Sequence, residues 1–310
     1  NLPLAAFAAW RLYRLPAGER HPPAHAGADV PGQILFALGT LGALFWLTSG
    51  GHRFAWLSPV SASIFAIAVI SLALLVWHER RHKAPFLPVD LLRDTTLRLS
   101  AILVVLFAAC MFAIIFFLPI YLQLGHSVSA QTSGLLLLPV TAGQVIAAIV
   151  STRVLRRTGE PHYIPVIGMS LTSTALVVLG LAPPSLALII ALGFLAGLGL
   201  GTVMPVNQVV VQTVAGRTRL SAVSATVSLS RSTGGAAGAA LFGALVFGLL
   251  PHIDRHALAQ TGALDVATVV GAFQWGFLCA AGVAALAAFT ASRMPRITLW
   301  APAAKQAGGD

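Results

Sequence analysis

Long apolar runs, separated by short polar segments, follow one another along most of this chain. Each run is long enough to cross the roughly 30 Å hydrocarbon core of a bilayer, because a helix rises about 1.5 Å per residue. The pattern therefore predicts about nine membrane-spanning helices: a shortened one within residues 1–14, and further ones at 32–49, 55–77, 98–122, 130–153, 163–182, 185–213, 221–250 and 267–291.

The composition agrees with a chain whose solvent is lipid. Hydrophobic residues make up 57% of the sequence and charged residues 9%, too few charges to cover a water-soluble surface. The formal net charge is +10. It does not indicate a nucleic-acid partner, because the basic residues gather in short clusters between the apolar runs. The cysteines, Cys110 and Cys279, fall inside predicted spans and indicate no disulfide. We therefore expect an all-α integral membrane protein.

Basic turns alternate with nearly uncharged ones along the chain. Of the 19 Lys and Arg residues, only Arg53 and Arg255 lie in the neutral turns, and only Arg231 lies within a span. Positive residues are retained on the cytoplasmic side of a membrane. The alternation therefore predicts a multi-pass protein of the cell's inner, cytoplasmic membrane, with the basic turns and the C-terminus in the cytoplasm.

The polar segments suggest a division of the chain. The stretch at 15–31 is rich in Pro, His, Gly and Ala, which is typical of a linker. The charged cluster at 79–83 and the prolines after it mark a boundary between helical units. The first residue is not Met and lies inside an apolar run, so we expect a fragment whose upstream part is missing. The expected units are 1–14, 15–31 (a cytoplasmic linker), 32–94 (two helices and a cytoplasmic loop), 95–294 (six helices) and 295–310 (a cytoplasmic tail).

The hairpin at 115–159 carries the most informative motifs. It contains FFLPIYLQ at 116–123, a turn with Ser129 as the helix cap, GLLLLP, and an Arg-rich stretch that ends at Gly159. These motifs resemble the major facilitator superfamily and, more narrowly, its fourteen-helix drug:proton antiporter branch. Residues Arg153, Arg157 and Gly159 match the loop signature of that family, although Arg156 stands where an acidic residue is usual.

The resemblance covers the chain up to Pro295, but only about half of a whole transporter. It implies that 1–14 is the last helix of an N-terminal half and that 32–94 holds an inserted pair. The span 95–294 is then the six-helix C-terminal half, built from inverted three-helix repeats. The implied function is alternating-access, proton-coupled export of amphipathic drugs or toxic compounds. The implied partners are a small-molecule substrate, protons, membrane lipids and, in the full system, a periplasmic adaptor.

The acidic residues bear on that mechanism through their positions. All nine Asp and Glu residues fall in predicted loops or tails. A proton-coupled carrier usually keeps a carboxylate within the bilayer. Either the coupling acids belong to the missing half, which we favour, or the protein is not driven by protons.

Arg231 is the one charge that we expect within a span, roughly 15 Å deep by helical rise. The family has Arg, two further residues and then Gly-Gly at this place, as in Arg231-Ser-Thr-Gly234-Gly235. Arg231 is then a cation facing the cavity or a gate, or it only extends to the nearby interface.

Amides and aromatic residues within the spans are the other candidates for the substrate cavity. Each amide can bind substrate or simply a neighbouring helix, and aromatic side chains often face lipid. Besides Arg231, the candidates for the cavity or gate are Gln123, Gln144, Asn207, Gln208, Gln212, Phe117 and Tyr121, with Phe116 as a weaker one.

Small residues at helical spacing indicate close packing between helices in lipid. Gly193, Gly197 and Gly201 share one helix face, and we expect the same role for Gly234, Gly235 and Gly238. Pro205 is expected to bend its helix.

No nucleophile motif, phosphate loop or metal-ligand spacing occurs, so we expect no enzyme, cofactor or metal. Two other functions stay open. One is a carrier for a defined solute such as a metabolite or siderophore. The other is a membrane scaffold or inactive fragment that transports nothing.

Overall fold

The computed structural model describes residues 6–7, 10–11, 29–50, 53–81, 93–181, 185–216, 219–249 and 266–295. Apart from one isolated bridge between Gly50 and Phe54, the regular structure in these residues is helical. The helices are α2 (Val30–Ser49), α3 (Pro59–Glu79), α4 (Thr95–His126), α5 (Ala130–Leu135), α6 (Leu138–Thr158), α7 (Tyr163–Leu181), α8 (Leu186–Gly201), α9 (Val203–Ala215), α10 (Leu220–Leu249) and α12 (Val266–Ser292).

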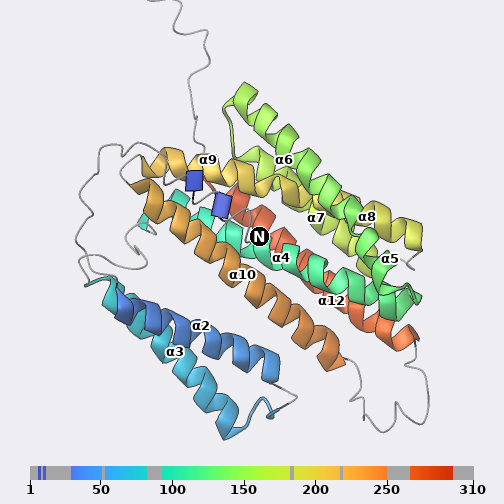
Figure 1. The fold of residues 1–310 in the computed structure, drawn as a ribbon, viewed down its shortest axis with the longest axis horizontal. Helices are drawn as coiled ribbons and strands as arrows, with labels where there is room; N and C mark the ends of the chain where they lie inside the picture. Colours follow the sequence, from blue (N-terminus) through green and yellow to red (C-terminus); the bar gives the residue numbers. More distant parts are fainter. Residues whose placement is uncertain are drawn as a thin grey trace, which may run out of the picture.

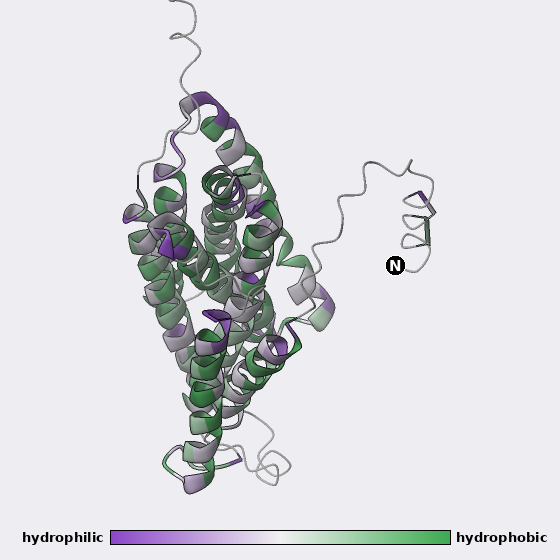
Figure 2. Ribbon diagram, turned by 90° about the vertical axis from the view of Figure 1, so that its left-hand side faces the viewer, coloured by the Kyte–Doolittle hydropathy of each residue, from purple (hydrophilic) through white to green (hydrophobic). Residues whose placement is uncertain are grey.

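The described residues form 8 helical segments that are long and apolar enough to cross a membrane. The predicted all-helical membrane fold is thereby confirmed, with span ends a few residues from those expected. The predicted first span and linker, the second half of the 79–94 boundary and the tail beyond Pro295 lie largely outside the described residues. Hydrophobic residues cover most of the helical surface and hydrophilic residues form short patches (Figure 2), as expected for helices that face lipid.

Two predicted spans each consist of two helices, and proline explains both breaks. Pro139 and Pro205 have no N–H to donate to the carbonyl four residues earlier. Those carbonyls belong to Leu135 and Gly201, where α5 and α8 end. The expected bend at Pro205 is therefore a break at Thr202. The span predicted at 130–153 is found at Ala130–Thr158 and consists of α5 and α6, because Pro139 acts in the same way.

The six C-terminal helices pack in a pattern that has an internal symmetry. α4 contacts α10 and α12, α8 contacts α6 and α7, and α7 contacts α12 (Figure 1). Exchanging α4 with α8–α9, α6 with α10 and α7 with α12 reproduces these contacts. Two three-helix repeats of opposite orientation produce this pattern.

Close glycine contacts give the helix directions within that bundle. A Cβ atom on Gly234 would meet the backbone of Val105, and one on Gly238 would meet the backbone of Ala109. α10 and α4 therefore run parallel. Thr172 of α7 donates a hydrogen bond to the carbonyl of Ala196 in α8 (3.1 Å). α7 and α8 are consecutive in the chain and in contact, so they run antiparallel. The ends of the bundle thus differ: the starts of α4 and α10 and the ends of α6, α9 and α12 form one end, which we call the basic end.

α2 and α3 form a separate hairpin beside α10 (Figure 1). Asp29 caps α2 and accepts hydrogen bonds from the backbone N–H of Gly32 (2.9 Å), and its Oδ1 lies 2.8 Å from Nε2 of His78. At the other end, Nε1 of Trp46 donates to Oγ of Ser61 (2.8 Å). Polar contacts thus join the two helices at both ends of the hairpin.

The structure corrects two sequence-based placements. Arg153, Arg156 and Arg157 lie in the last turns of α6 and not in a loop after it. Glu79 is the last residue of α3 and is buried, so it is not a loop residue. Both changes arise because the helices continue past the predicted spans, α6 by five residues beyond 153 and α3 by two residues beyond 77.

A candidate transport face

The short helix α9 places its polar residues on opposite sides. Val203, Val206, Asn207, Val210 and Val211 are buried in the bundle. Gln208 and Gln212, which are four residues apart, lie on the other side; Gln208 is partly exposed and Gln212 is exposed. α9 touches both α6 and α10. Gln208 and Gln212 therefore lie on a helix that is in contact with the helices of Gln144 (α6) and Arg231 (α10).

Arg231 is exposed on α10, about 16 Å along the helix from Leu220. Among the described residues no carboxylate lies within ion-pair distance of its guanidinium. Ser228, one turn earlier, is exposed on the same side of α10. An unpaired guanidinium at such a depth is costly in hydrocarbon, so this side of α10 favours a hydrated or partnered environment over lipid.

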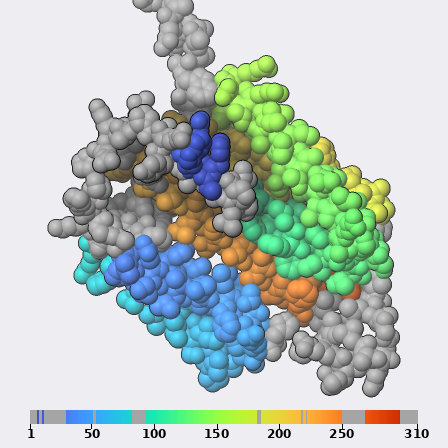
Figure 3. All heavy atoms as spheres, viewed as in Figure 1, coloured from blue at the N-terminus to red at the C-terminus, as the bar shows by residue number. Residues whose placement is uncertain are grey.

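Gln144 lies on α6 where that helix meets α8. A Cβ atom on Gly201 would clash with the backbone carbonyl of Gln144, so the two backbones are in contact. Nε2 of Gln144 is buried and has no hydrogen-bond partner in the described part of the chain. We call Gln144, Gln208, Gln212, Ser228 and Arg231 the polar set. α4 and α10 pack side by side on the face shown in Figure 3, and α9 contacts both α6 and α10.

The polar set carries no acidic residue. The described acids Asp29, Glu79, Asp94 and Glu160 all lie at or beyond helix ends. Asp94, for example, caps α4 by accepting from the N–H groups of Thr96 and Leu97. In this part of the chain, the charge available within a span is therefore positive.

The remaining cavity candidates are placed differently. Phe117 and Tyr121 lie inside the bundle, where Tyr121 is 0% exposed and packs against Phe273 and Phe277, while Phe116 is 51% exposed. Gln123 donates from Nε2 to Oγ of Ser133 (3.0 Å) and thereby joins α4 to α5. The rings of Phe117 and Tyr121 are buried in this structure, and the described contact of Gln123 is to its own hairpin. A role of these residues in substrate binding stays a prediction.

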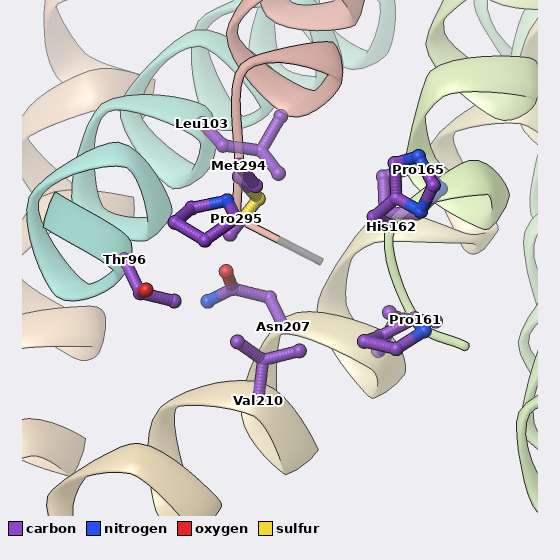
Figure 4. A pocket seen from close by; sticks show the side chains of 10 residues that line it. Thr96, Leu103, Pro161, His162, Pro165, Asn207, Val210, Met294 and Pro295 are labelled. Atoms are coloured by element: carbon purple, nitrogen blue, oxygen red, sulfur yellow. The ribbon is translucent and has the colours of Figure 1, made fainter. Parts of the chain in front are cut away.

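Asn207 lies apart from the polar set, in a small cavity near the basic end. The cavity is lined from four directions by α4, the start of α7, α9 and the end of α12 (Figure 4). The predicted cavity amides are therefore divided between an outer side of α9 and the interior of the bundle.

The glycine candidates occupy contacts between parallel helices. Gly197 of α8 faces the carbonyl of Val140 in α6, and Gly193 faces the Val140 side chain. Gly235 faces the ring of Phe112 on α4. Together with Gly201, Gly234 and Gly238, these residues allow α6–α8 and α4–α10 to approach closely.

The backbone conformation explains why glycine stands at the end of the basic motif, at Gly159. Gly159 ends α6 with φ of 69°, and its N–H donates to the carbonyl of Leu155 (2.9 Å). This left-handed cap favours glycine. Arg153 and Arg157 are exposed beside it.

Comparison with known proteins identifies the family. The family model described as Major Facilitator Superfamily matches residues 13–239. The chain belongs to this superfamily. The resemblance inferred from the hairpin motifs is confirmed at that level, and the chain is a multi-pass membrane protein of this superfamily.

Several curated relatives are named as transporters, and one of them as an export protein. The chain is 27% identical over 220 residues to the multidrug transporter protein MdtP of Bacillus subtilis, covering 70% of this chain and 40% of that protein. It is 29% identical over 261 residues to the tetracenomycin C resistance and export protein of Streptomyces glaucescens, covering 82% and 48%. An uncharacterised transporter of the superfamily from Mycobacterium tuberculosis is 30% identical over 245 residues, covering 78% and 35%. The chain thus spans less than half the length of these relatives.

A solved structure has a similar fold. A bacterial homologue of the human lysosomal transporter Spinster, in an inward-facing and occupied conformation, matches with a TM-score of 0.53 at 15% identity. The match covers 88% of this chain and 67% of that one. The likeness concerns the arrangement of helices alone.

Some residues of interest carried no clear signal in the sequence. Ser228 is an ordinary residue of a small-residue helix, and only its position one turn before Arg231 indicates a shared side. The contact between Asp29 and His78 joins residues 49 positions apart. From the sequence, Asp29 was placed only among the loop acids, and neither its role as the cap of α2 nor its partner in α3 was predicted.

Proposed function

We propose that the chain is the C-terminal part of a fourteen-helix drug:proton antiporter that exports amphipathic compounds by alternating access. The observation that carries the proposal is the polar set on neighbouring helices of a largely apolar bundle, with Arg231 lacking a carboxylate partner among the described residues. The names of two relatives, a multidrug transporter and a tetracenomycin C resistance and export protein, support the substrate class. The separate α2–α3 hairpin supports the fourteen-helix branch, since an inserted pair is expected ahead of a six-helix half.

Alternating access requires two halves that move about a shared cavity. In this proposal the polar set lines that cavity from the C-terminal side. Gln144, Gln208 and Gln212 supply neutral donors and acceptors, and Arg231 supplies a cation beside them. A cation at this place disfavours a positively charged substrate close by, so an acid of the other half is expected to balance it.

The coupling chemistry then belongs mainly to the other half of the carrier. A proton-coupled step needs a carboxylate whose protonation changes during the cycle. The described acids of this chain lie at helix ends, away from the polar set. We therefore assign proton binding to acids outside this chain, with the basic end of the present bundle in the cytoplasm of the cell.

The proposal is tested by dye efflux from cells that express the complete carrier. Cells loaded with ethidium should lose it faster than cells with an empty vector, and a protonophore should abolish the difference. An Arg231→Ala carrier of equal abundance serves as the matched control. Efflux that ignores the protonophore would overturn proton coupling. Equal retention of every amphipathic compound tested, with uptake or export of one defined solute, would favour the solute carrier, and no transport at all would favour the scaffold.

A further inference from the structure

A small cavity lies near the basic end of the bundle, where four helices meet. Its walls are formed by Thr96 and Leu103 of α4, by Val206, Asn207 and Val210 of α9, and by residues at the start of α7 and the end of α12. Pro161, His162 and Pro165 lie at the start of α7, and Met294 and Pro295 lie at the end of α12. The space open to the centre of a water molecule is about 10 Å³, which is about the room that one water needs.

Asn207 is the polar group that extends furthest into this cavity. Its side chain is 1% exposed. Neither Oδ1 nor Nδ2 has a hydrogen-bond partner among the residues that the structure describes. The carboxamide points from α9 into the space between Thr96, Pro295 and Pro161 (Figure 4). A buried amide that makes no hydrogen bond is strongly unfavourable, so its two polar atoms indicate a bound polar ligand.

The facing wall on α4 is also polar. Thr96 lies opposite Asn207 across the cavity (Figure 4) and is 6% exposed. Its backbone N–H is already bound by Asp94, so its hydroxyl is the group that remains for a ligand. Ser100 lies one turn further along α4, outside the lining of this cavity, and is 0% exposed. Its Oγ also lacks a partner among the described residues.

The size and chemistry of the cavity select the ligand. A drug-sized ligand needs roughly 300 Å³ or more, so the cavity is not a substrate pocket. No carboxylate lines it, whereas a bound cation would need oxygen ligands that carry negative charge. Neutral donors and acceptors in a space for one small molecule match water, which makes two to four hydrogen bonds when buried.

We propose that this cavity binds one ordered water molecule, which bridges the carboxamide of Asn207 on α9 to the hydroxyl of Thr96 on α4. The water completes the hydrogen bonding of a buried amide one turn after the break at Thr202. It thereby fixes the short helix α9 to α4 at the basic end of the bundle. This inference does not depend on the proposed transport function.

A double-mutant cycle on the purified protein in detergent tests the bridge. The variants are Asn207→Leu, Thr96→Val and the two combined, and the measurement is the midpoint of thermal unfolding. Leu has the branched shape and the number of side-chain heavy atoms of Asn, and Val keeps the shape of Thr without its hydroxyl. If water forms the bridge, each single change should lower the midpoint by about 2–4 °C. The combined change should lower it by less than the sum, because both break the same bridge.

Two results would contradict the water bridge. Without a bound water, Asn207→Leu removes an unsatisfied amide, and the midpoint should rise. Additive losses would also overturn the bridge. Thr141→Val is the control, because that exposed hydroxyl bonds only the carbonyl of Leu137 in its own helix turn, and it should change the midpoint little. If Asn207→Leu does not accumulate, Asn207→Ser and Thr96→Val complete the same cycle with the same reading.

Discussion

Nε2 of His78 lies 2.8 Å from Oδ1 of Asp29, and the same oxygen accepts the backbone N–H of Gly32. One carboxylate oxygen thus caps α2 and joins it to the end of α3. Asp29 is buried, at 4% exposure. The hairpin has few contacts with the rest of the protein, of which those between α2 and α10 are the main ones. The contacts of Asp29 are therefore among the interactions that hold α2 and α3 together.

Two substitutions of Asp29 distinguish its role as the cap of α2 from the effect of its negative charge. Asp29→Ala removes the acceptor for both bonds and should lower the free energy of unfolding by about 1–2 kcal/mol, since a lost N-cap alone costs about 0.5–2 kcal/mol. Asp29→Asn keeps an oxygen acceptor at the cap and should cost clearly less. Thermal unfolding of the two variants in detergent is the measurement. Equal losses would mean that the negative charge, and not the cap, is what matters.

The contact between Gly197 and Val140 predicts a large effect of a single methyl group. A Cβ atom on Gly197 would clash with the carbonyl of Val140. Gly197→Ala should therefore destabilise the protein by about 1–3 kcal/mol, since a backbone must shift. Gly282→Ala is the matched control, because nothing lies within 4 Å of its Cβ position in α12. That change should be neutral or slightly stabilising, since alanine favours helix. Heating each variant and measuring the folded fraction decides; a Gly197→Ala protein as stable as Gly282→Ala would contradict the tight contact.

These contacts show where sequence reasoning succeeded and where it stopped. The apolar runs are long, so the spans were predicted to within a few residues. The faces of the helices were not, because both the protein interior and lipid select apolar side chains, and the helical period loses its contrast. Phe116 and Tyr121 stand in one motif, yet one is 51% exposed and the other 0%.

The helix breaks were only partly predictable. Pro205 was expected to bend its helix, but the same reasoning was not applied to Pro139, whose place after four leucines favours a continuous helix by composition. Within the candidate site, the amides were found by type alone. Their division between the polar set and the Asn207 cavity depends on the direction of α9 after its break, which local sequence does not determine.

Arg231 should affect transport more than folding. If it faces the cavity or a gate, Arg231→Lys keeps the charge but loses the planar guanidinium, and the transport rate per carrier should fall. Arg231→Ala should reduce the rate further, with normal abundance in the membrane. The measurement is dye efflux divided by carrier abundance. An arginine that only extends to the interface predicts that Lys replaces it fully, and full activity of both variants would remove Arg231 from the mechanism.

The orientation of the bundle can be tested at the two ends of one span. Gln131, at the start of α5, and Arg156, in the last turn of α6, are both exposed. In a background without Cys110 and Cys279, an impermeant thiol reagent should label Gln131→Cys in intact cells. Arg156→Cys should react only after the cells are opened, because the basic end is expected in the cytoplasm. Labelling of Arg156→Cys in intact cells would reverse the orientation.

The backbone contacts of the glycines also bear on how this bundle can deform. Where Gly197 and Gly201 touch α6, and where Gly234 and Gly238 touch α4, no side chain can change rotamer to absorb a displacement. We therefore expect each parallel pair, α6 with α8 and α4 with α10, to move as one rigid unit. Relative movement is then expected between the two pairs. The single-residue break at Thr202 allows α9 to tilt without separating the helices of either pair.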